Sequence, residues 1–343
     1  MDRRDRILAA IRHEPPDQIP AHVINIDDAK PYLTHLGFDD WEALCDYLGI
    51  CIRLIIPRHK KNIYGTGVFG DANGNDYSDS TCGRPLAGAA SVSDISAYGW
   101  PSADDFDYGI LSSALDKYYG KYAIMASGWN PIFCQVLMLF GMENALTRLC
   151  LEPSIIEAAV EHIEEFYLDF YKRFFEAVKG RADIFNMGDD FATQRGMLLS
   201  PEQWRRFFKP TYKKIFDLAK SYGLYVWFHS CGAIGAVLPD LIDIGIDVWE
   251  TVQAHLPGNE PERLKREYGR DIAFFGAINT QETLPFGTPE KVRAEVRERI
   301  RVLGKGGGYI CGPDHHINAK VPIENTLAMF DEINKFRHAG YTL

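Results

Sequence analysis

The chain has 343 residues and a formal net charge of -10 at pH 7. Hydrophobic residues make up 46% and charged residues 24%, so the chain can bury a large core and is neither disordered nor fibrous. The negative charge argues against a nucleic-acid or anionic-membrane surface, because both need clustered Lys and Arg. A small-molecule substrate and protein partners are therefore expected.

The first 18 residues hold only a short apolar stretch before charge and proline return, which predicts neither a signal peptide nor an anchor. No run approaches the roughly 20 apolar residues that a membrane span needs. The seven cysteines are an odd number scattered from Cys45 to Cys311. This pattern is typical of a reduced, cytoplasmic protein and not of a disulfide framework.

The first 120 residues are irregular. A helix is predicted at 4–13, and apolar strands at 19–25 and 50–57. Residues 64–83 are dense in Gly, Asn and Asp, which predicts a hairpin excursion. No linker separates this region from the rest. We therefore expect one domain, residues 1–343, with 1–120 as an N-terminal extension, excursion and first strands, and 121–343 as regular βα units.

From residue 121 onward, short β-branched or aromatic runs alternate with longer amphipathic segments. This alternation predicts an α/β fold with a parallel sheet. The expected strands are 121–127, 182–188, 224–230, 246–251, 271–277 and 307–312. Helices are expected near 136–149, 153–179, 200–223, 233–243, 259–268, 287–303 and 323–339.

Polar side chains that can bind metals or substrates recur where these strands end. In a parallel α/β barrel the ligand site forms at that edge, so we expect the side chains to gather there. In chain order they are Asn186, Asp189, Asp190, His229, Cys231, Glu250, Gln253, Asn279, Cys311, Asp314, His315 and His316.

His229 and Cys231 stand two residues apart at the end of one predicted strand. In an extended chain, residues i and i+2 point the same way, so the imidazole and the thiol can reach a common point. Zinc accepts both ligand types in a tetrahedral arrangement. The alternative is a packed thiol beside a hydrogen-bonded core histidine. The second thiol and the histidine pair at the end of the last strand favour the metal site.

Two adjacent carboxylates, Asp189 and Asp190, follow another strand. One is expected to face the site, as a substrate clamp, a proton carrier or a further metal ligand. The alternative is that both cap the following turn. Glu250 directly follows an apolar strand and needs a partner such as Arg195 or the metal, unless it is a solvated residue at the edge.

Four long segments resemble the uroporphyrinogen decarboxylase superfamily across roughly Gly120 to Phe336. They are "GDDFATQRGMLLSPEQWRRFFKPTYKKIFDLAKSYG", "FHSCGAIGAVLPDLIDIGIDVWETVQ", "FFGAINTQETLPFGTPEKV" and "GGYICGPDHHINAKVPIEN". The resemblance implies a (β/α)8 TIM barrel with its site at the carboxyl ends of the strands. It also implies one of two chemistries: decarboxylation of porphyrinogen acetates without a cofactor, or zinc-dependent methyl transfer to or from a corrinoid on a partner protein.

The decarboxylase branch carries an Arg-Gln-Ala-Gly-Arg segment and an early strand-end aspartate, and neither is evident in this sequence. The methyltransferase branch carries the His-x-Cys pair found at His229 and Cys231. Its third ligand, usually a cysteine, falls on His315, and the nearest thiol is Cys311. The resemblance thus implies a zinc site of His229, Cys231 and either His315 or Cys311.

The favoured function is zinc-dependent transfer of a methyl group between a small substrate, either a methoxylated compound or a thiol, and a corrinoid (methylcobalamin) held by a partner protein. O-demethylation is one form of this reaction. The expected catalytic residues are Asp189, Asp190 and Glu250, and the expected substrate contacts are Asn186, Arg195, Gln253, Asn279 and His316.

Two alternatives remain. A decarboxylase would need cationic side chains that bind several substrate carboxylates. The only candidates in the sequence are Arg195, Arg53 and Arg84. A corrinoid-binding protein without catalysis would have no use for a zinc ion with an open position. Whether the chain forms a homodimer is open.

Overall fold

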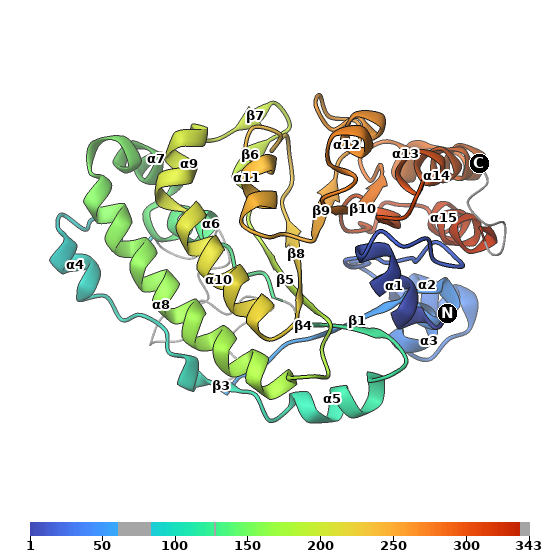
Figure 1. Ribbon diagram of the computed structural model, residues 1–343, viewed down its shortest axis with the longest axis horizontal. Coiled ribbons are helices and arrows are strands. Elements are labelled where there is room, and N and C mark those ends of the chain that lie inside the picture. Colours follow the sequence, from blue (N-terminus) through green and yellow to red (C-terminus); the bar gives the residue numbers. More distant parts are fainter. Residues whose placement is uncertain (61–83, 127, 337–343) are drawn as a thin grey trace. The chain divides into compact units, whose positions relative to one another are not determined.

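The structure is a computed structural model that describes residues 1–60, 84–126 and 128–336 (Figure 1). The excursion predicted at 64–83 lies outside the described residues. Contacts divide the chain into two compact units. The first comprises Met1–Arg53, Gly120–Ala123 and Asp247–Leu343, and the second comprises Leu54–Tyr119 and Ile124–Ile246. The single domain predicted for the chain stays a prediction.

A seven-stranded sheet has the order β1-β4-β5-β8-β9-β10-β11. Neighbouring strands pair in parallel in β4/β5, β5/β8, β9/β10 and β10/β11. All residues of β10 are buried, as expected for a strand covered on both faces. The strands are β1 (Ile52–Ile55), β4 (Ala123–Ala126), β5 (Ile184–Gly188), β8 (Tyr225–His229), β9 (Val248–Val252), β10 (Ala273–Ile278) and β11 (Tyr309–Pro313).

An eighth position is filled by the segment around Ala21, where a strand was expected. Ala21 forms isolated parallel bridges with both Ile50 and Cys311. The backbone N–H of His22 donates to the carbonyl of Cys311 at 3.2 Å, and the N–H of Cys51 donates to the carbonyl of Ala21 at 3.0 Å. The parallel strands and their flanking helices confirm the predicted α/β fold class, and the isolated bridges at Ala21 confirm its irregular N-terminal region.

The second unit contains the longest helix, α8 (Figure 1, light green). Thr211 on α10 donates a hydrogen bond to Glu164 on α8 at 2.8 Å, and the two helices pack together. Two small antiparallel pairs, β2/β3 and β6/β7, also belong here. The elements are β2 (Arg58–His59), α4 (Val92–Ser96), η1 (Ala103–Asp105), β3 (Phe106–Asp107), α5 (Leu111–Tyr118), α6 (Phe133–Phe140), α7 (Met142–Leu151), α8 (Pro153–Val178), β6 (Ala192–Thr193), β7 (Gly196–Met197), α9 (Pro201–Phe207), α10 (Lys209–Ser221) and α11 (Leu238–Asp243).

The first unit carries the helices that flank β9, β10 and β11. Helices α14 and α15 pack against each other, and Arg293 on α14 forms an ion pair with Asp331 on α15 at 2.6 Å. The helices are α1 (Arg3–Ile11), α2 (Lys30–Leu36), α3 (Trp41–Leu48), α12 (Pro261–Tyr268), α13 (Thr283–Phe286), α14 (Pro289–Leu303) and α15 (Ile323–Lys335).

Two helices predicted as continuous are each divided into two. The predicted helix at 200–223 breaks at Phe208, because Pro210 has no backbone N–H and takes the first turn of a new helix, α10. The segment predicted at 136–149 breaks at Gly141, whose φ of 82° is readily adopted only by glycine. The predicted helix at 233–243 is shorter than expected and begins only at Leu238.

Within the part of the chain that the structure describes, no helix combines the length and the apolar character needed to cross a lipid bilayer.

Candidate metal site at the strand ends

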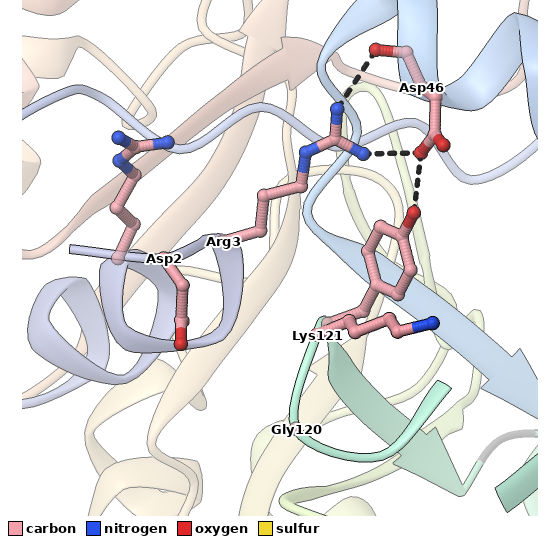
Figure 2. A pocket seen from close by; sticks show the side chains of 7 residues that line it. Asp2, Arg3, Asp46, Gly120 and Lys121 are labelled. Carbon is pink, nitrogen blue, oxygen red and sulfur yellow. Dashed lines mark hydrogen bonds and ion pairs between the residues drawn. The ribbon is translucent and has the colours of Figure 1, made fainter. Parts of the chain in front are cut away.

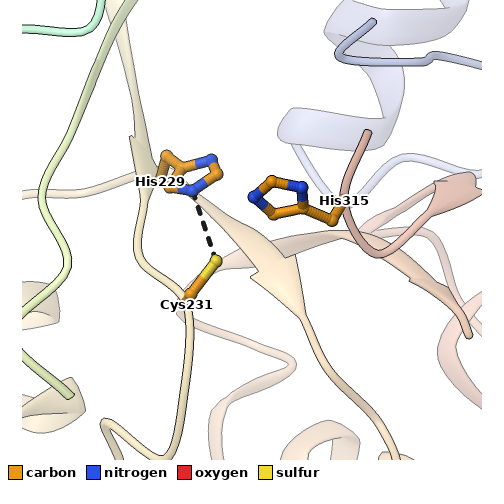
Figure 3. A group of neighbouring side chains, drawn as sticks. All are labelled: His229, Cys231 and His315. Carbon is orange, nitrogen blue, oxygen red and sulfur yellow. Dashed lines mark hydrogen bonds between the residues drawn. The ribbon is translucent and has the colours of Figure 1, made fainter. Parts of the chain in front are cut away.

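His229 and Cys231 form a close pair at the carboxyl end of β8 (Figure 3). The Sγ of Cys231 lies 3.5 Å from the Nε2 of His229. His229 is 8% exposed, and Cys231 is half-buried. Strand β8 is buried from Val226 to His229, and the imidazole of its last residue meets the thiol of Cys231 two residues further along the chain.

This separation matches a zinc site. With Zn–N near 2.0–2.1 Å and Zn–S near 2.3 Å, two ligand atoms in tetrahedral positions stand about 3.5 Å apart. A nitrogen and a sulfur ligand also suit zinc chemically. The pair therefore fits two of the ligands of a zinc ion, as the sequence predicts.

Asp190 holds the backbone of this pair. Its Oδ1 accepts a hydrogen bond from the backbone N–H of Cys231 at 2.8 Å and lies 3.9 Å from the Nε2 of His229. The side chain of Asp190 is 35% exposed. Of the two adjacent carboxylates, Asp190 is thus the one that contacts the His229 and Cys231 pair.

Asp189 points into the core, where it is fully buried. It accepts hydrogen bonds from the backbone N–H groups of Ile132 and Phe133, at 2.8 and 2.5 Å, and from the N–H of Cys134 at 3.0 Å. The hydroxyl of Tyr212 also donates to it. Burial raises the pKa of Asp189. These contacts tie β5 to the N-terminus of α6, some 55 residues earlier in the chain, whereas the expected alternative was a cap on the turn that follows Asp190.

Two further predicted site residues, Asn186 and Arg195, belong to the same unit as the pair. Asn186, on β5, donates from Nδ2 to the carbonyl of Trp227 at 3.2 Å. Arg195 is exposed in the turn between β6 and β7. That hairpin packs on the loop after Cys231, since a Cβ added to Gly232 would stand 2.7 Å from the carbonyl oxygen of Thr193. Arg195 is therefore available to a ligand near this loop.

Cys311 and His315 differ in their surroundings in the first unit. Cys311 lies within β11, is fully buried and accepts a hydrogen bond from the hydroxyl of Tyr309 at 3.4 Å. Burial raises the pKa of its thiol to about 12. His315 follows the strand and is half-buried, with its ring centroid 4.6 Å from that of His316. His315 therefore has the more accessible ligand atom.

The predicted catalytic residue Glu250 and the predicted substrate residues of the first unit vary in exposure. Glu250 lies in the middle of β9 and Gln253 in the loop after it, and each is 4% exposed, so Glu250 is not the solvated edge residue of the alternative expectation. Asn279 caps the turn that leads into α13, because its Oδ1 accepts from the N–H groups of Gln281 and Glu282 at 2.7 and 2.9 Å. His316 is half-exposed, with Nδ1 3.4 Å from Asp27.

His255 was not predicted as part of the site, whereas its partner Asp314 was among the expected strand-end side chains. The Nδ1 of His255 lies 3.7 Å from the Oδ2 of Asp314. Asp314 is fully buried, and Thr280 donates to its Oδ1 from both the backbone N–H, at 3.0 Å, and the hydroxyl, at 2.6 Å. Burial raises the pKa of Asp314 to about 7. The sequence signal was a histidine three residues after β9.

A second group of charges in the first unit is largely paired within the protein. Figure 2 shows Asp46 receiving hydrogen bonds from Arg3 and from the hydroxyl of Tyr122, the latter at 2.6 Å. Arg53 also binds Asp46, at 2.9 Å, and Glu42, at 2.9 Å, and is 4% exposed. The hollow is lined by Asp2, Arg3, Arg6, Asp46, Gly120, Lys121 and Tyr122. Of the arginines that line it, Arg3 is paired with Asp46 and Arg6 with Asp17.

Comparison with curated proteins finds low identity to methyltransferases and a decarboxylase. The chain is 27% identical over 222 residues to a methylated-thiol–coenzyme M methyltransferase of Methanosarcina mazei, which covers 64% of this chain and 55% of that protein. It is 26% identical to a methylcobamide:CoM methyltransferase MtaA of Methanosarcina barkeri, over 44% of this chain and 41% of that protein. It is also 26% identical to a uroporphyrinogen decarboxylase of Carboxydothermus hydrogenoformans, over 42% and 39%. The matches thus span about half the length of these relatives, or less.

Comparison with solved structures supports the fold. A methyltransferase from Methanosarcina mazei superposes with a TM-score of 0.69 at 20% identity, covering 98% of this chain and 99% of that one. The uroporphyrinogen decarboxylase (URO-D) family model matches residues 110–336, which is more than half of the chain. The resemblance seen in the sequence is confirmed, and the chain belongs to the uroporphyrinogen decarboxylase family.

Proposed function

We propose that this protein is a methyltransferase that binds one zinc ion and moves a methyl group between a small substrate and a corrinoid carried by a partner protein. The observation that carries the proposal is the 3.5 Å separation between His229 Nε2 and Cys231 Sγ at the end of β8. The names of two relatives, a methylated-thiol–coenzyme M methyltransferase and a methylcobamide:CoM methyltransferase, support methyl transfer and the corrinoid.

His315 is our choice for the third ligand, which completes a set of His229, Cys231 and His315. It follows β11, as His229 ends β8 and Cys231 follows it, and carboxyl ends of parallel strands meet at one edge of a barrel. The competing thiol, Cys311, is packed inside and has a raised pKa, so its thiolate is disfavoured. Three protein ligands leave one position of a tetrahedral zinc ion for the substrate.

Two nitrogens and one sulfur leave a metal more positive than a set with two sulfurs, which favours an oxygen substrate over a thiol. We therefore propose a methoxylated compound as the donor, in an O-demethylation. Zinc bound here would supply Lewis acidity that polarises the ether oxygen.

Side chains of the protein would then bind the substrate and orient it. Asp190 holds the backbone of Cys231 and remains a candidate for proton transfer, as does Glu250 within β9. Asp189 was also predicted as catalytic, and its four hydrogen bonds favour a supporting role instead. Arg195 is exposed and suited to an anionic group on the substrate. Asn186, Gln253, Asn279 and His316 remain proposed substrate contacts.

The proposal is tested by metal analysis together with a transfer assay. Protein purified without chelator should contain one zinc per chain. Removal of the zinc should abolish methyl transfer from a panel of methoxylated aromatics to added cob(I)alamin, kept reduced by a chemical reductant, and from added methylcobalamin to thiols. Zinc in the preparation that Cys231→Ala does not remove would contradict the ligand assignment. Undiminished activity after complete removal of zinc would contradict the proposed chemistry.

A decarboxylase is the second candidate, favoured by the match to the decarboxylase of Carboxydothermus hydrogenoformans. Such an enzyme needs free cations to bind several carboxylates. Of the three arginines considered, Arg53 is buried and paired with Glu42 and Asp46, so it is not available. Release of CO₂ from a porphyrinogen by metal-free protein would favour this candidate over methyl transfer.

A further inference from the structure

Trp129 lies directly against the imidazole of His229. The two ring centroids are 5.4 Å apart, and the ring planes meet at 86° in an edge-to-face contact. Trp129 follows β4 and is half-buried, whereas His229 ends β8. Strand β5 stands between β4 and β8, so the two rings meet across the end of an intervening strand.

Gly188 makes this contact possible. It ends β5 and is in register with His229 on β8. A Cβ added to Gly188 would stand 2.7 Å from Cζ3 of Trp129 and 2.8 Å from Cβ of His229, closer than side chains tolerate. The glycine thus leaves the space that the indole occupies beside the histidine.

The segment that carries Trp129 is held by buried hydrogen bonds. Asn130 donates from Nδ2 to the hydroxyl of Tyr171 at 2.7 Å, and the hydroxyl of Tyr167 donates to the carbonyl of Pro131 at 2.9 Å. The backbone N–H groups at the start of α6, which begin three residues after Trp129, donate hydrogen bonds to Asp189. The indole is therefore presented by a fixed part of the chain, which can constrain the ring it touches.

We infer that Trp129 is a positioning residue that holds the His229 imidazole with Nε2 toward Cys231. An imidazole that rotates about its Cβ–Cγ bond turns Nε2 away from a neighbouring ligand, and a rigid aromatic ring packed against it restricts that rotation. The importance of this for metal binding rests on the proposed function. Substitution of a group that orients a ligand histidine typically lowers the metal affinity by about 10- to 100-fold.

The first test uses metal-free protein with ¹³C-labelled histidine. The ring resonances of His229 are identified by their loss in His229→Gln. They should shift in Trp129→Leu, because the ring current of the indole is removed, and they should broaden or double as the imidazole gains a second orientation. Trp129→Phe keeps an aromatic ring and should largely restore a single resonance.

A matched control is present in the same unit. Trp100 stacks on His162 with ring centroids 4.9 Å apart and an angle of 20° between the planes. Trp100→Leu also removes an indole beside a histidine, and it should shift the resonance of His162 while that of His229 stays unchanged. His229 resonances that are the same in Trp129→Leu and wild type would overturn the inference, whether or not the protein binds zinc.

The second test measures zinc affinity by competition with a chelator. Trp129→Leu should raise the dissociation constant about 10-fold, with Trp129→Phe closer to wild type and Trp100→Leu equal to it. A wild-type protein that binds no zinc would contradict the proposed function, and the resonance test alone would then decide the positioning role. Zinc binding of equal affinity in Trp129→Leu and wild type would contradict the positioning role and leave the proposed function standing.

Discussion

The Oδ1 of Asp190 accepts a hydrogen bond from the backbone N–H of Cys231 at 2.8 Å, whereas its neighbour Asp189 is turned into the core. Two adjacent carboxylates therefore have different surroundings. One contacts the loop that carries the proposed zinc ligand, and the other ties β5 to the start of α6. Substitutions at Asp190 and Asp189 should therefore differ in their effects on turnover and on stability.

Asp190→Asn is expected to lower turnover and leave the free energy of unfolding within about 0.5 kcal/mol of wild type, because the side chain is partly exposed. Asp189→Asn should instead destabilise the protein by about 2 kcal/mol, because the amide cannot accept all four hydrogen bonds. Urea unfolding and steady-state kinetics on both variants make the comparison. Equal, small effects of the two substitutions on turnover and on stability would contradict this difference in role.

Cys231→Ala should abolish stoichiometric zinc binding and activity while the fold survives, because a ligand that follows a strand contributes little to the core beneath it. Elemental analysis and circular dichroism on the variant are the measurements. Cys150→Ala is the control, since Cys150 is an exposed thiol on α7 and should keep the full zinc content. Full zinc content in Cys231→Ala, or a loss of the circular dichroism signal, would contradict this expectation.

The pair at the end of β8 could be predicted from the sequence because its geometry depends only on residues close together in the chain. Strand alternation alone puts His229 and Cys231 on one side, and their spacing is unaffected by the rest of the fold. The role of Asp189 depends on the backbone at Ile132 to Cys134, some 55 residues earlier in the chain. The contact between Trp129 and His229 likewise joins two different strand ends. Such contacts become visible only when the strands are placed side by side.

The predicted elements differ from the structure for equally local reasons. Apolar periodicity continues through Phe208, so the pattern predicts one helix, and only the missing N–H of Pro210 ends it. In the N-terminal region the strand expected at 19–25 is reduced to single bridges at Ala21 and Ile26. The apolar pattern indicated the buried position of this segment, and it could not indicate how many backbone hydrogen bonds form there.

Stability should fall in acid because of His22. This side chain is 2% exposed and packs on Phe275 with ring centroids 5.2 Å apart. Burial lowers its pKa from 6.5 to about 4, with opposing attraction from Glu250 and added repulsion from Arg53. A histidine with a lowered pKa contributes stability above its unfolded pKa, and this contribution is lost as the pH falls from about 6.5 to about 4.

The loss is expected to reach about 3 kcal/mol at pH 4. Urea unfolding of metal-free protein between pH 7 and 4 measures it, and His22→Phe should reduce the slope of stability with pH. His35, an exposed histidine on α2, supplies the control, since His35→Phe should keep the wild-type slope. An unchanged slope in His22→Phe would mean that other groups cause the acid sensitivity.

The last prediction concerns the third zinc ligand. X-ray absorption on the zinc-loaded protein counts sulfur ligands directly, and we expect one sulfur, from Cys231, with the remaining protein ligands nitrogen. Cys311→Ser should leave the zinc content and this spectrum unchanged, because the thiol of Cys311 is packed against Tyr309 and its pKa is raised to about 12. His315→Ala should weaken zinc binding about 100-fold or more, whereas His316→Ala, at the neighbouring half-exposed histidine, should not. Two sulfurs in the spectrum of the wild type, together with the loss of one in Cys311→Ser, would assign the position to Cys311. The metal would then be less positive, and a thiol would replace the methoxylated compound as the expected substrate.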